Sequence, residues 1–598
     1  MADKKVISVA IIGSGPAGFY TASALIDRGA KNGIDYHIDI LERLPTPFGL
    51  IRGGVAPDHQ TTKRVALKFE KTARNEHVRF FGNVELGRDV KLNELRSLYD
   101  AVVLAIGAPE DQKLSIPGLD KYGVFGSAAF VGWYNGHPDF TDLNPDLNTR
   151  SAIVVGAGNV AMDCARVLVR SSKAMLDTDE PETVVNAISH SPITDVYLTA
   201  RRGPMDVKFS NVELRELEHL NLTVPIVRPE QLPDENAEVA STTSDRDARL
   251  AEKNLDVFRR YSKNSEKEKH KHIRFEFFAS PVEILGGERV EGVRFERTRV
   301  VDGKAEPLGE FFDIDCGLVI TAIGYRADPI EGAPYDEKRG LIPNDNGVIE
   351  DGLYAVGWIK RGPSGVISSN RPDGEIVADI IAAKSFSESR PGRAGFGDLL
   401  AERQIRAVSF DDWKIIEQAE NLNAEGQGPG RKFTHVKDML DVLDREKRAK
   451  NNTQVNETPD LPYKADLTPQ QAWDMLSQHP ESLLVDVRTD AEFNYVGLPD
   501  LRVLGREPYL IPWVLFPDMQ ANPNFQQSVE QAAGDPDCPI LFLCRSGVRS
   551  KYAAEHMTGM GYIRCYNIQF GFEGVPDENN HRGQINGWKA DGLPWFQG

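Results

Sequence analysis

The sequence predicts an α/β protein with more than one parallel sheet. Two short apolar segments each run into a glycine-rich turn and then a helical pattern, with the turns at 13–18 and 156–161. A third apolar segment, 540–543, delivers a cysteine to the start of another helical pattern. Strand, turn and helix in this order are typical of parallel sheets. With 598 residues, the chain is also too long for a single hydrophobic core.

The composition is that of an ordinary globular protein, with 40% hydrophobic and 27% charged residues. The balance of 70 Lys and Arg against 89 Asp and Glu gives a formal net charge of −19, which argues against a nucleic-acid partner. The sequence has no uncharged apolar run long enough to cross a membrane. Its five cysteines are scattered and form no C-x-x-C. We therefore expect no disulfide framework, no metal site and a cytoplasmic location.

The first glycine-rich turn has the spacing of a dinucleotide-binding site. Its small residues are Gly13, Gly15, Ala17 and Gly18, and they follow the strand pattern 8–12. In such a site the first glycine allows a tight turn, the second lets a pyrophosphate approach the backbone, and the third lets helix and strand pack closely. The next predicted strand, 36–41, ends in Glu42, which is placed to accept a hydrogen bond from a ribose hydroxyl.

The second turn repeats this pattern with an alanine as its third small residue. It begins with Gly156, Ala157, Gly158 and Asn159. After the strand pattern 196–199 the chain carries Arg201 and Arg202, where a site for NAD would carry an acid. Guanidinium groups match phosphate geometry, so this pair favours a ribose 2′-phosphate and hence NADP(H). The alternative is that both arginines are solvated surface charges.

Two dinucleotide sites in one chain indicate two cofactors that exchange electrons, the layout of a flavoenzyme in which NADPH meets FAD. The apolar segments 101–108 and 318–325 both contain Ala-Ile-Gly, and we interpret them as the two crossings between the domains. The NADP-binding domain is then inserted in the FAD-binding domain. The expected boundaries are 1–107 and 323–444 for the FAD-binding domain with its C-terminal extension, and 108–322 for the NADP-binding domain.

The segment 44–59 resembles the signature of the adrenodoxin-reductase type of ferredoxin–NADP+ reductase. Segments 159–163, 201–204 and 357–363 are similar to the same family, in the same order, and the likeness extends to about Leu443. The resemblance implies an FAD site formed by Ala17, Glu42, Leu50, Leu86, Trp358, Gly365, Val366 and Ile367. It implies an NADP(H) site formed by Gly156, Ala157, Gly158, Asn159, Arg201, Arg202, Glu213 and Gly365. His59 and Asp163 would line the pocket where the nicotinamide meets the flavin.

The function that this resemblance implies is electron transfer between NADPH and a ferredoxin-like iron–sulfur carrier, through FAD. An NADPH-dependent flavin diaphorase that uses quinones or oxygen is an alternative. His59 either takes part in this chemistry or only orders its loop. No cysteine lies near 45–55, so we do not expect a direct relay from the flavin to a disulfide.

A basic segment stands out in this acidic chain. From Arg246 to Arg274 there are ten Lys and Arg against five Asp and Glu. Ferredoxins are commonly acidic, so the segment could steer their docking. The alternative is a helix or loop that its charges keep solvated.

A polar stretch, 445–463, is interpreted as a linker to a third domain at 464–598. Thr468 is placed to cap the first helix of this domain, with Pro469 as its first residue. Further along, the chain carries a cysteine loop between a predicted strand and a predicted helix; its residues run Cys544, Arg545, Ser546, Gly547, Val548, Arg549. A thiol at a helix N-terminus between two arginines favours an anionic sulfur.

Over its full length this third domain resembles a rhodanese, a sulfurtransferase. The resemblance implies that Cys544 accepts sulfane sulfur from a donor such as thiosulfate and carries it as a persulfide, which Arg545 and Arg549 stabilise. A cysteine phosphatase is the alternative chemistry, although phosphatase loops are longer. The domain could also be a non-catalytic binding module attached to a plain reductase. If both modules are active, reducing equivalents from the first could release sulfur held by the second.

Overall fold

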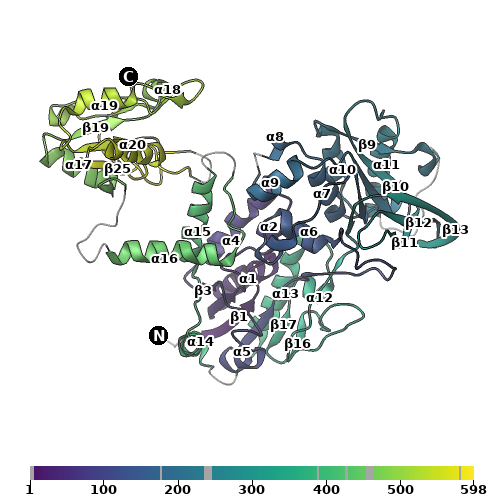
Figure 1. Cartoon of the computed structure of the whole chain (residues 1–598). Coiled ribbons are helices and arrows are strands. Elements are labelled where there is room, and N and C mark those ends of the chain that lie inside the picture. Colours follow the sequence, from purple (N-terminus) through teal and green to yellow (C-terminus); the bar gives the residue numbers. More distant parts are fainter. Residues whose placement is uncertain are drawn as a thin grey trace. The chain divides into compact units, whose positions relative to one another are not determined.

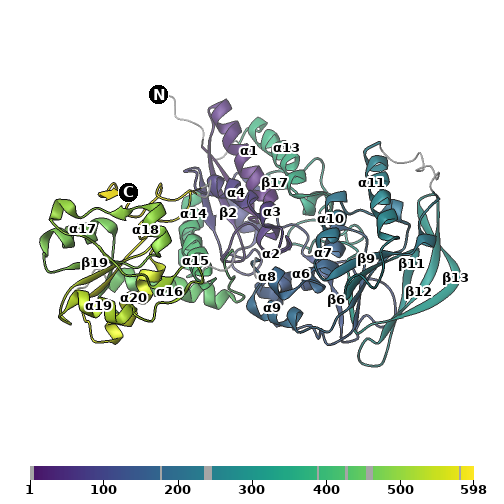
Figure 2. The same ribbon diagram turned by 90° about the horizontal axis from the view of Figure 1, so that it is seen from above.

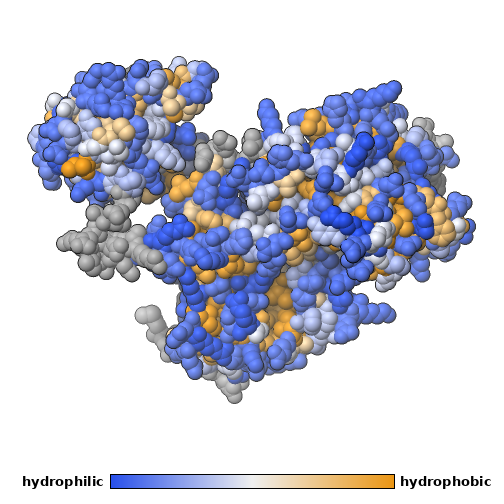
Figure 3. Space-filling view, viewed as in Figure 1, coloured by the Kyte–Doolittle hydropathy of each residue, from blue (hydrophilic) through white to orange (hydrophobic). Residues whose placement is uncertain are grey.

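The computed structural model describes residues 6–175, 178–234, 245–386, 390–424, 429–452, 462–577 and 581–597. The chain forms two compact units, Met1–Asp444 and Arg445–Gly598. Among the described helices, none combines the length and apolar character that a membrane crossing requires. The face drawn in Figure 3 is largely hydrophilic, with apolar residues in small groups between hydrophilic ones.

The first unit is built on two six-stranded sheets. The first sheet has the order β16-β17-β4-β1-β2-β3 and is parallel except at β16. Its strands are β1 (Val6–Ile12), β2 (Asp35–Leu41), β3 (Val78–Phe81), β4 (Ala101–Leu104), β16 (Val348–Glu350) and β17 (Leu353–Ala355). The central strands are apolar almost throughout, because helices cover both faces of a parallel sheet.

The second sheet is entirely parallel, in the order β6-β14-β7-β8-β10-β9. Its strands are β6 (Val124–Gly126), β7 (Ser151–Val155), β8 (Asp195–Ala200), β9 (Thr223–Val227), β10 (Lys271–Phe277) and β14 (Leu318–Thr321). All of them lie in sequence between β4 and β17 of the first sheet, so this domain is inserted in the other. The two crossing segments pair with each other, β5 (Glu110–Asp111) antiparallel to β15 (Tyr325–Arg326).

Helices pack on both sheets and form separate clusters of buried apolar residues with them. In both views α1 (Pro16–Asn32) and α13 (Asn370–Ala383) lie side by side on the first sheet (Figure 1 and Figure 2). On the second sheet, α7 (Asn159–Leu168) follows β7 and contacts α6 (Ser127–Tyr134). A three-stranded antiparallel sheet is attached to the inserted domain; it consists of β11 (Ala279–Leu285), β12 (Gly292–Val301) and β13 (Lys304–Asp315).

The C-terminal extension of the first unit contains α14 (Gly392–Glu402), α15 (Phe410–Asn423) and the beginning of α16 (Val436–Asn452), which continues past Asp444. Phe410 and Trp413 of α15 pack edge-on against Phe48, which joins this extension to the first core. The first part of the predicted linker is helical, because α16 continues through 445–452, a stretch rich in Arg and Lys, which favour helix. Residues 453–461 of the predicted linker lie outside the described residues.

The second unit is a parallel five-stranded sheet in the order β18-β25-β24-β19-β21. Its strands are β18 (Ala465–Leu467), β19 (Leu483–Asp486), β21 (Tyr509–Leu510), β24 (Ile540–Leu543) and β25 (Cys565–Ile568). The main helices are α17 (Pro469–Gln478), α18 (Asp490–Val496), α19 (Phe525–Ala533) and α20 (Val548–Gly559). Thr468 caps α17 as predicted, since its side chain accepts a hydrogen bond from the backbone N of Gln471 at 3.2 Å.

Candidate functional site

The first glycine fingerprint lies at the carboxyl end of β1, where α1 begins. Gly13 has a φ of +108°, and a Cβ there would lie 2.5 Å from the carbonyl oxygen of Ala105. A Cβ at Gly18 would lie 2.2 Å from the carbonyl oxygen of Gly13, whereas a Cβ at Gly15 would meet nothing within 4 Å. The first and third glycines are therefore required by packing. The second borders open space at a helix N-terminus, where a pyrophosphate fits.

Glu42 follows β2 and faces this turn. Its carboxylate accepts hydrogen bonds from the backbone N of Ser14 at 3.2 Å and from the Ser14 hydroxyl at 2.7 Å. The backbone N of Leu44 donates to it at 3.2 Å. These donors hold the carboxylate beside the fingerprint, the position from which an acid binds a ribose hydroxyl.

The other residues predicted to hold FAD lie on short elements around this turn. The loop before α2 (Leu50–Gly53) touches the fingerprint, since a Cβ at Gly49 would lie 3.1 Å from the Cα of Gly15. Likewise, a Cβ at Gly357, just before α12 (Trp358–Arg361), would lie 2.7 Å from the Cβ of Ala17. The Trp358 side chain donates to the carbonyl of Ser364 at 3.2 Å, which ties α12 to the loop that carries Gly365, Val366 and Ile367.

Two of these predicted residues present apolar side chains to solvent: Leu50 is 48% exposed and Val366 is 61% exposed. Apolar groups beside an open fingerprint are what a flat aromatic ring would cover. Leu86 differs from them, because it packs on the core cluster that holds Ile12 and Leu41 at the ends of β1 and β2.

The second fingerprint repeats this geometry at the carboxyl end of β7. Gly156 has a φ of +153°, and a Cβ there would lie 2.2 Å from the carbonyl oxygen of Ala322, whereas a Cβ at Gly158 would meet nothing within 4 Å. Asn159 opens α7, and its side chain accepts a hydrogen bond from the backbone N of Ser210 at 2.9 Å. Ala157 accepts one from the backbone N of Lys208 at 2.7 Å. The loop after β8 is thus tied to this fingerprint.

Arg201 and Arg202 follow β8, at the same sheet edge as this fingerprint, because β7 and β8 are parallel neighbours. Arg201 is exposed, and within the described part of the chain its guanidinium has no hydrogen-bond or ion-pair partner. Arg202 donates to the carbonyl of Gly303 at 3.3 Å and pairs with Asp206 at 3.2 Å. Arg201 therefore has its charge available for a ligand, while Arg202 is partly engaged.

His59, Asp163 and Glu213, all predicted site residues, meet in one cluster between the two domains. His59 directly precedes α3 (Gln60–Lys63), and its Nε2 lies 2.9 Å from Glu216 and 3.7 Å from Glu213 on α10 (Asn211–Glu216). Arg166 links His59 to Asp163, with its guanidinium 3.0 Å from the His59 Nε2 and 2.6 Å from the Asp163 carboxylate. A cavity of about 260 Å³ opens beside His59 and Arg166.

The charges of this cluster shift its proton equilibria. Burial works against a charge on His59, but the hydrogen bond to Glu216 and the nearby carboxylates outweigh it and raise its pKa to about 9. Burial, reinforced by the charge of Glu213, raises the pKa of Asp163 to about 8. The cluster therefore has groups that can hold or move a proton near neutral pH.

His59, Glu213 and Glu216 also place ligand atoms within 4.8 Å of one another, a spacing that a metal ion could use. Arg166 is 97% buried and already contacts His59, Asp163 and Asp58. Its guanidinium supplies positive charge at this point, so the donor set favours an ion-pair network over a metal site.

The sequence reasoning missed Arg166 and Glu216. Their spacing in the sequence could have indicated both residues. Arg166 lies three residues after Asp163 on α7, and Glu216 lies three residues after Glu213 on α10. Residues at this spacing share one face of a helix. A site residue on a helix therefore points to its neighbour one turn away.

Most of the basic segment lies on α11 (Asp245–Tyr261) and runs from there into β10. Arg260 pairs with Glu218 at 2.7 Å, and Arg274 pairs with Asp195 at 2.7 Å. The side chain of Arg246 lies outside the described residues. Part of the positive charge counted in the sequence is therefore balanced within the domain.

The thiol of Cys544 lies in the loop that joins β24 to α20, and Cys544 is only 1% exposed. Its Sγ accepts hydrogen bonds from the backbone N of Gly547 at 3.1 Å and from the Ser550 hydroxyl at 3.2 Å. A Cβ at Gly571 would lie 2.2 Å from the Cys544 carbonyl oxygen, so this glycine is needed for the loop to pack. Two hydrogen-bond donors and a helix N-terminus are thus directed at the sulfur.

The two arginines predicted to flank this sulfur differ. Arg549 forms a double hydrogen bond with Glu492, at 2.8 and 2.6 Å. Burial of Glu492 opposes its charge, but Arg549 and the donors of Thr489 outweigh it and lower the pKa of Glu492 to about 2. Arg545 is exposed, with no partner for its guanidinium in the described residues. Glu492 was missed as a site residue, although the capping box from Thr489 to Glu492 marks it.

The thiol of Cys565 cannot reach Cys544 in the folded domain. Cys565 on β25 is paired with Ile540 on β24. Cys544 lies four residues beyond Ile540, which is about 13 Å along a strand direction. That distance is too long for a disulfide. Burial raises the pKa of Cys565 to about 12, as expected for an inert core thiol.

Comparison with known proteins finds relatives for the first unit. Residues 7–224 match the family model described as pyridine nucleotide-disulphide oxidoreductase. The mitochondrial NADPH:adrenodoxin oxidoreductase of Arabidopsis thaliana is 38% identical over 467 residues, covering 73% of this chain and 96% of the relative. NADPH-ferredoxin reductase FprA of Mycobacterium tuberculosis is 37% identical over 454 residues, covering 73% of this chain and 98% of the relative.

The solved structure of Mycobacterium tuberculosis FprA in complex with NADPH superposes with a TM-score of 0.68 at 36% identity, covering 73% of this chain and all of that one. The second unit matches a different family model, the rhodanese-like domain, over residues 468–577. The two sets of matches therefore cover separate units of the chain.

Proposed function

The first unit of the chain belongs to the family of NADPH-dependent adrenodoxin and ferredoxin reductases, and from this premise we propose that it transfers electrons between NADPH and a ferredoxin-like iron–sulfur protein, with FAD between them. The observation that carries the proposal is the pair of glycine fingerprints, each closed by packing at its first glycine and open at its second. When bound, FAD supplies a centre that takes a hydride from the nicotinamide and gives up electrons one at a time.

The protein's own residues bind and orient the two nucleotides. The backbone N–H groups at the start of α1 receive the FAD pyrophosphate, and Glu42 binds its ribose. Leu50, Trp358 and Val366 provide the apolar surface for the flavin ring. Two of these side chains are already held in place by hydrogen bonds, Glu42 by Ser14 and Trp358 by Ser364.

The NADP(H) site is formed in the same way on the inserted domain. The start of α7 receives the pyrophosphate, and Arg201 binds the 2′-phosphate with Arg202 beside it. Glu213, His59 and Asp163 border the nicotinamide end. His59, with its pKa raised to about 9, keeps a positive charge there at neutral pH and donates from Nε2 to the Glu216 carboxylate.

A ferredoxin titration tests this proposal. The full-length protein oxidises NADPH anaerobically while the concentration of a bacterial-type ferredoxin is varied. We expect a rate that saturates with ferredoxin, and a rate independent of ferredoxin contradicts the proposal and favours a diaphorase.

Docking on the basic segment is tested by Lys267→Glu, which should raise the KM for ferredoxin and weaken the salt dependence of that KM.

We further propose that the second unit transfers sulfane sulfur through Cys544. The thiolate attacks the outer sulfur of thiosulfate, the S–S bond of thiosulfate breaks, and sulfite leaves with the bonding electron pair. Cys544 then carries a persulfide, whose outer sulfur passes to cyanide or a thiolate, and the Cys544 thiolate returns. Gly547 and Ser550 donate hydrogen bonds to the anionic sulfur, and Arg545 attracts the anionic donor.

Replacement of Cys544 by serine tests this step in the full chain. We expect Cys544→Ser to abolish thiocyanate formation from thiosulfate and cyanide, while Cys565→Ser, a matched control in the same sheet, keeps it. Thiocyanate formation by Cys544→Ser contradicts the proposal. No thiocyanate formation by the wild type also contradicts it and favours a non-catalytic binding module.

Coupling between the two units has a separate test. A persulfide that takes up two electrons and one proton yields the Cys544 thiolate and hydrosulfide. We therefore expect NADPH-dependent sulfide release from thiosulfate under anaerobic conditions, with and without ferredoxin. Sulfide release that does not depend on NADPH contradicts the coupling.

A further inference from the structure

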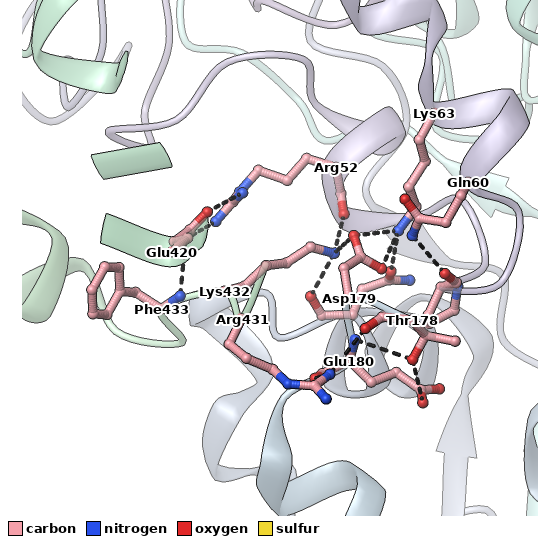
Figure 4. A network of polar contacts seen from close by, with 12 residues as sticks. Arg52, Gln60, Lys63, Thr178, Asp179, Glu180, Glu420, Arg431, Lys432 and Phe433 are labelled. Atoms are coloured by element: carbon pink, nitrogen blue, oxygen red, sulfur yellow. Dashed lines mark hydrogen bonds and ion pairs between the residues drawn. The ribbon is translucent and has the colours of Figure 1, made fainter. Parts of the chain in front are cut away.

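The segment Gly430–His435, which we call the strap, directly precedes α16 and contacts both nucleotide-binding domains. Figure 4 shows the polar network that it forms with residues from both of them. None of the roles assigned above involves this network. The residues labelled there come from three distant parts of the sequence, 52–63, 178–180 and 420–433. Asn135 of the inserted domain also accepts hydrogen bonds from Lys63 and Lys432.

One side of the strap is fixed to the FAD-binding domain. Glu420 on α15 accepts two hydrogen bonds from Arg52 of α2, at 2.8 and 2.5 Å, and its side chain is only 5% exposed. The same carboxylate accepts a hydrogen bond from the backbone N of Phe433 at 2.9 Å, and the Glu420 carbonyl accepts one from the backbone N of Arg431 at 2.8 Å. Two backbone N–H groups of the strap are therefore bound to Glu420, and Glu420 is bound to Arg52 of the FAD-binding domain.

The other side reaches into the inserted domain. Arg431 donates to the carbonyls of Thr178 and Glu180, at 2.9 and 3.2 Å. The Lys432 ammonium lies 2.9 Å from the Asp179 carboxylate. Beyond it, the carbonyl of Thr434 accepts a hydrogen bond from the Thr141 hydroxyl at 2.6 Å. Two consecutive positions of the strap, Arg431 and Lys432, thus bind the segment 178–180 of the NADP-binding domain, and Thr434 binds Thr141 of the same domain.

Asp179 also receives a second ammonium. Lys63, the last residue of α3, lies 2.7 Å from one Asp179 oxygen and 2.8 Å from the other. The side chains of Lys63, Asp179 and Lys432 are only 10, 12 and 6% exposed, so this triad is nearly dry. Burial opposes the Asp179 charge, but the two lysines outweigh it and lower the pKa of Asp179 to about 2.

The triad is coupled to the candidate active site through α3, which is only four residues long. His59, just before α3, is tied to Glu216, and Lys63, at its end, is tied to Asp179. Both ties run from the FAD-binding domain to the inserted domain. A short helix held at both ends cannot shift without moving His59, and the two domains cannot rotate without breaking one of the ties.

We propose that Lys432 and Lys63, through Asp179, are positioning residues for hydride transfer. Resting on the proposed reductase function, this inference states that the strap sets the angle between the two domains at which nicotinamide and flavin meet. Hydride transfer depends steeply on this geometry, because a shift of about 1 Å can cost a hundredfold in rate. The affinity for the adenine half of NADP should not depend on that angle, because the residues proposed to bind it, Arg201 and Arg202, lie in the inserted domain.

We choose variants that leave no buried charge of the triad without a counter-charge. Lys432→Met leaves Lys63 paired with Asp179, and Lys63→Met leaves Lys432 paired with it, so each keeps a balanced buried pair. Asp179→Asn would leave two buried ammonium groups without a counter-charge and is the variant to avoid. Arg431→Met removes contacts of the strap without changing the charge of the triad. Arg406→Met is the control, because its exposed pair with Asp444, at 2.6 Å, holds the same extension but does not touch the inserted domain.

The experiment mixes the FAD-loaded full chain with NADPH anaerobically and follows flavin bleaching per bound flavin. The affinity for 2′,5′-ADP is measured alongside. We expect both lysine variants to bleach at least about tenfold more slowly, with affinity for 2′,5′-ADP changed less than about twofold, and Arg406→Met to match the wild type. Lys432→Arg, which keeps the charge, should recover most of the rate.

A purely structural role would lower the melting temperature and the flavin content but leave the rate per bound flavin unchanged. Wild-type rates per flavin in Lys432→Met and Lys63→Met therefore overturn the inference. If neither lysine variant holds flavin, Arg431→Met decides: a slower rate supports the inference, and a wild-type rate overturns it. A wild type that NADPH cannot reduce at all refutes the proposed function instead.

Discussion

Arg201 offers a sharp prediction, because the structure separates it from its neighbour. Its guanidinium is exposed and unpartnered among the described residues, whereas Arg202 already binds Gly303 and Asp206. We therefore expect Arg201 to provide most of the binding to a 2′-phosphate. Arg202→Ala, which also frees Asp206, is the matched comparison, and its effect should be the smaller of the two.

The magnitude follows from the number of bonds lost. A hydrogen bond between charged groups contributes about 1.5 to 3 kcal/mol, and Arg201→Ala removes one such interaction with no internal partner left unpaired. This range corresponds to a loss of about 10- to 150-fold in kcat/KM for NADPH. NADH carries no 2′-phosphate, so its kcat/KM should change less than about twofold.

The assay compares kcat/KM for NADPH and NADH in the wild type, Arg201→Ala and Arg202→Ala, with ferricyanide as the electron acceptor. High salt should weaken the NADPH preference of the wild type and leave that of Arg201→Ala nearly unchanged. An unchanged ratio of NADPH to NADH in Arg201→Ala refutes the reasoning. A larger loss in Arg202→Ala than in Arg201→Ala refutes the assignment between the two.

Three further predictions concern the two nucleotide sites and the thiol site. Gly15→Ala should keep the melting temperature of the FAD-free protein but lose FAD on purification. Gly13→Ala should lower both the melting temperature and the FAD content, because of these two positions only Gly13 would bring a Cβ against backbone. His59, with its pKa raised to about 9, stabilises the fold fully below pH 6.5 and loses this contribution as the pH rises through 9, so His59→Gln should flatten the fall in melting temperature over that interval. Glu492, with its pKa lowered to about 2, contributes stability above pH 4.5 that is lost as the pH falls toward 2. Glu492→Gln should therefore cost the second unit about 2 kcal/mol at neutral pH and remove this acid dependence, as followed by chemical denaturation.

The fold and both family resemblances could be predicted because their signals are local. Each fingerprint is a strand, a turn and a helix within about thirty residues, and the periodicity of these elements is written in the sequence itself. The comparisons confirm the reductase and rhodanese resemblances and the α/β fold class. The placement of single side chains at the two nucleotide sites stays a prediction.

The contacts between domains could not be predicted, because their partners are far apart in the chain. His59 and Glu216 are 157 residues apart, and Lys63 and Asp179 are 116 residues apart. A lysine in a short polar helix has no pattern that distinguishes burial from exposure. The partner of Arg549 could not be predicted for the same reason, because Glu492 lies 57 residues away. The sequence placed Arg549 beside the sulfur, and the structure pairs it with Glu492.

The surroundings of Cys544 constrain how the two units can cooperate. A sulfur on a residue that is 1% exposed cannot touch a flavin ring unless its loop opens, and Cys565 is too far away to accept the outer sulfur. Arg549 is neutralised by Glu492, so Arg545 and the backbone N–H groups are left to attract a ligand, and they suit a small anion. If Cys544 carries a persulfide, as proposed, its burial would favour reduction through a small diffusible sulfur species over direct contact with the flavin.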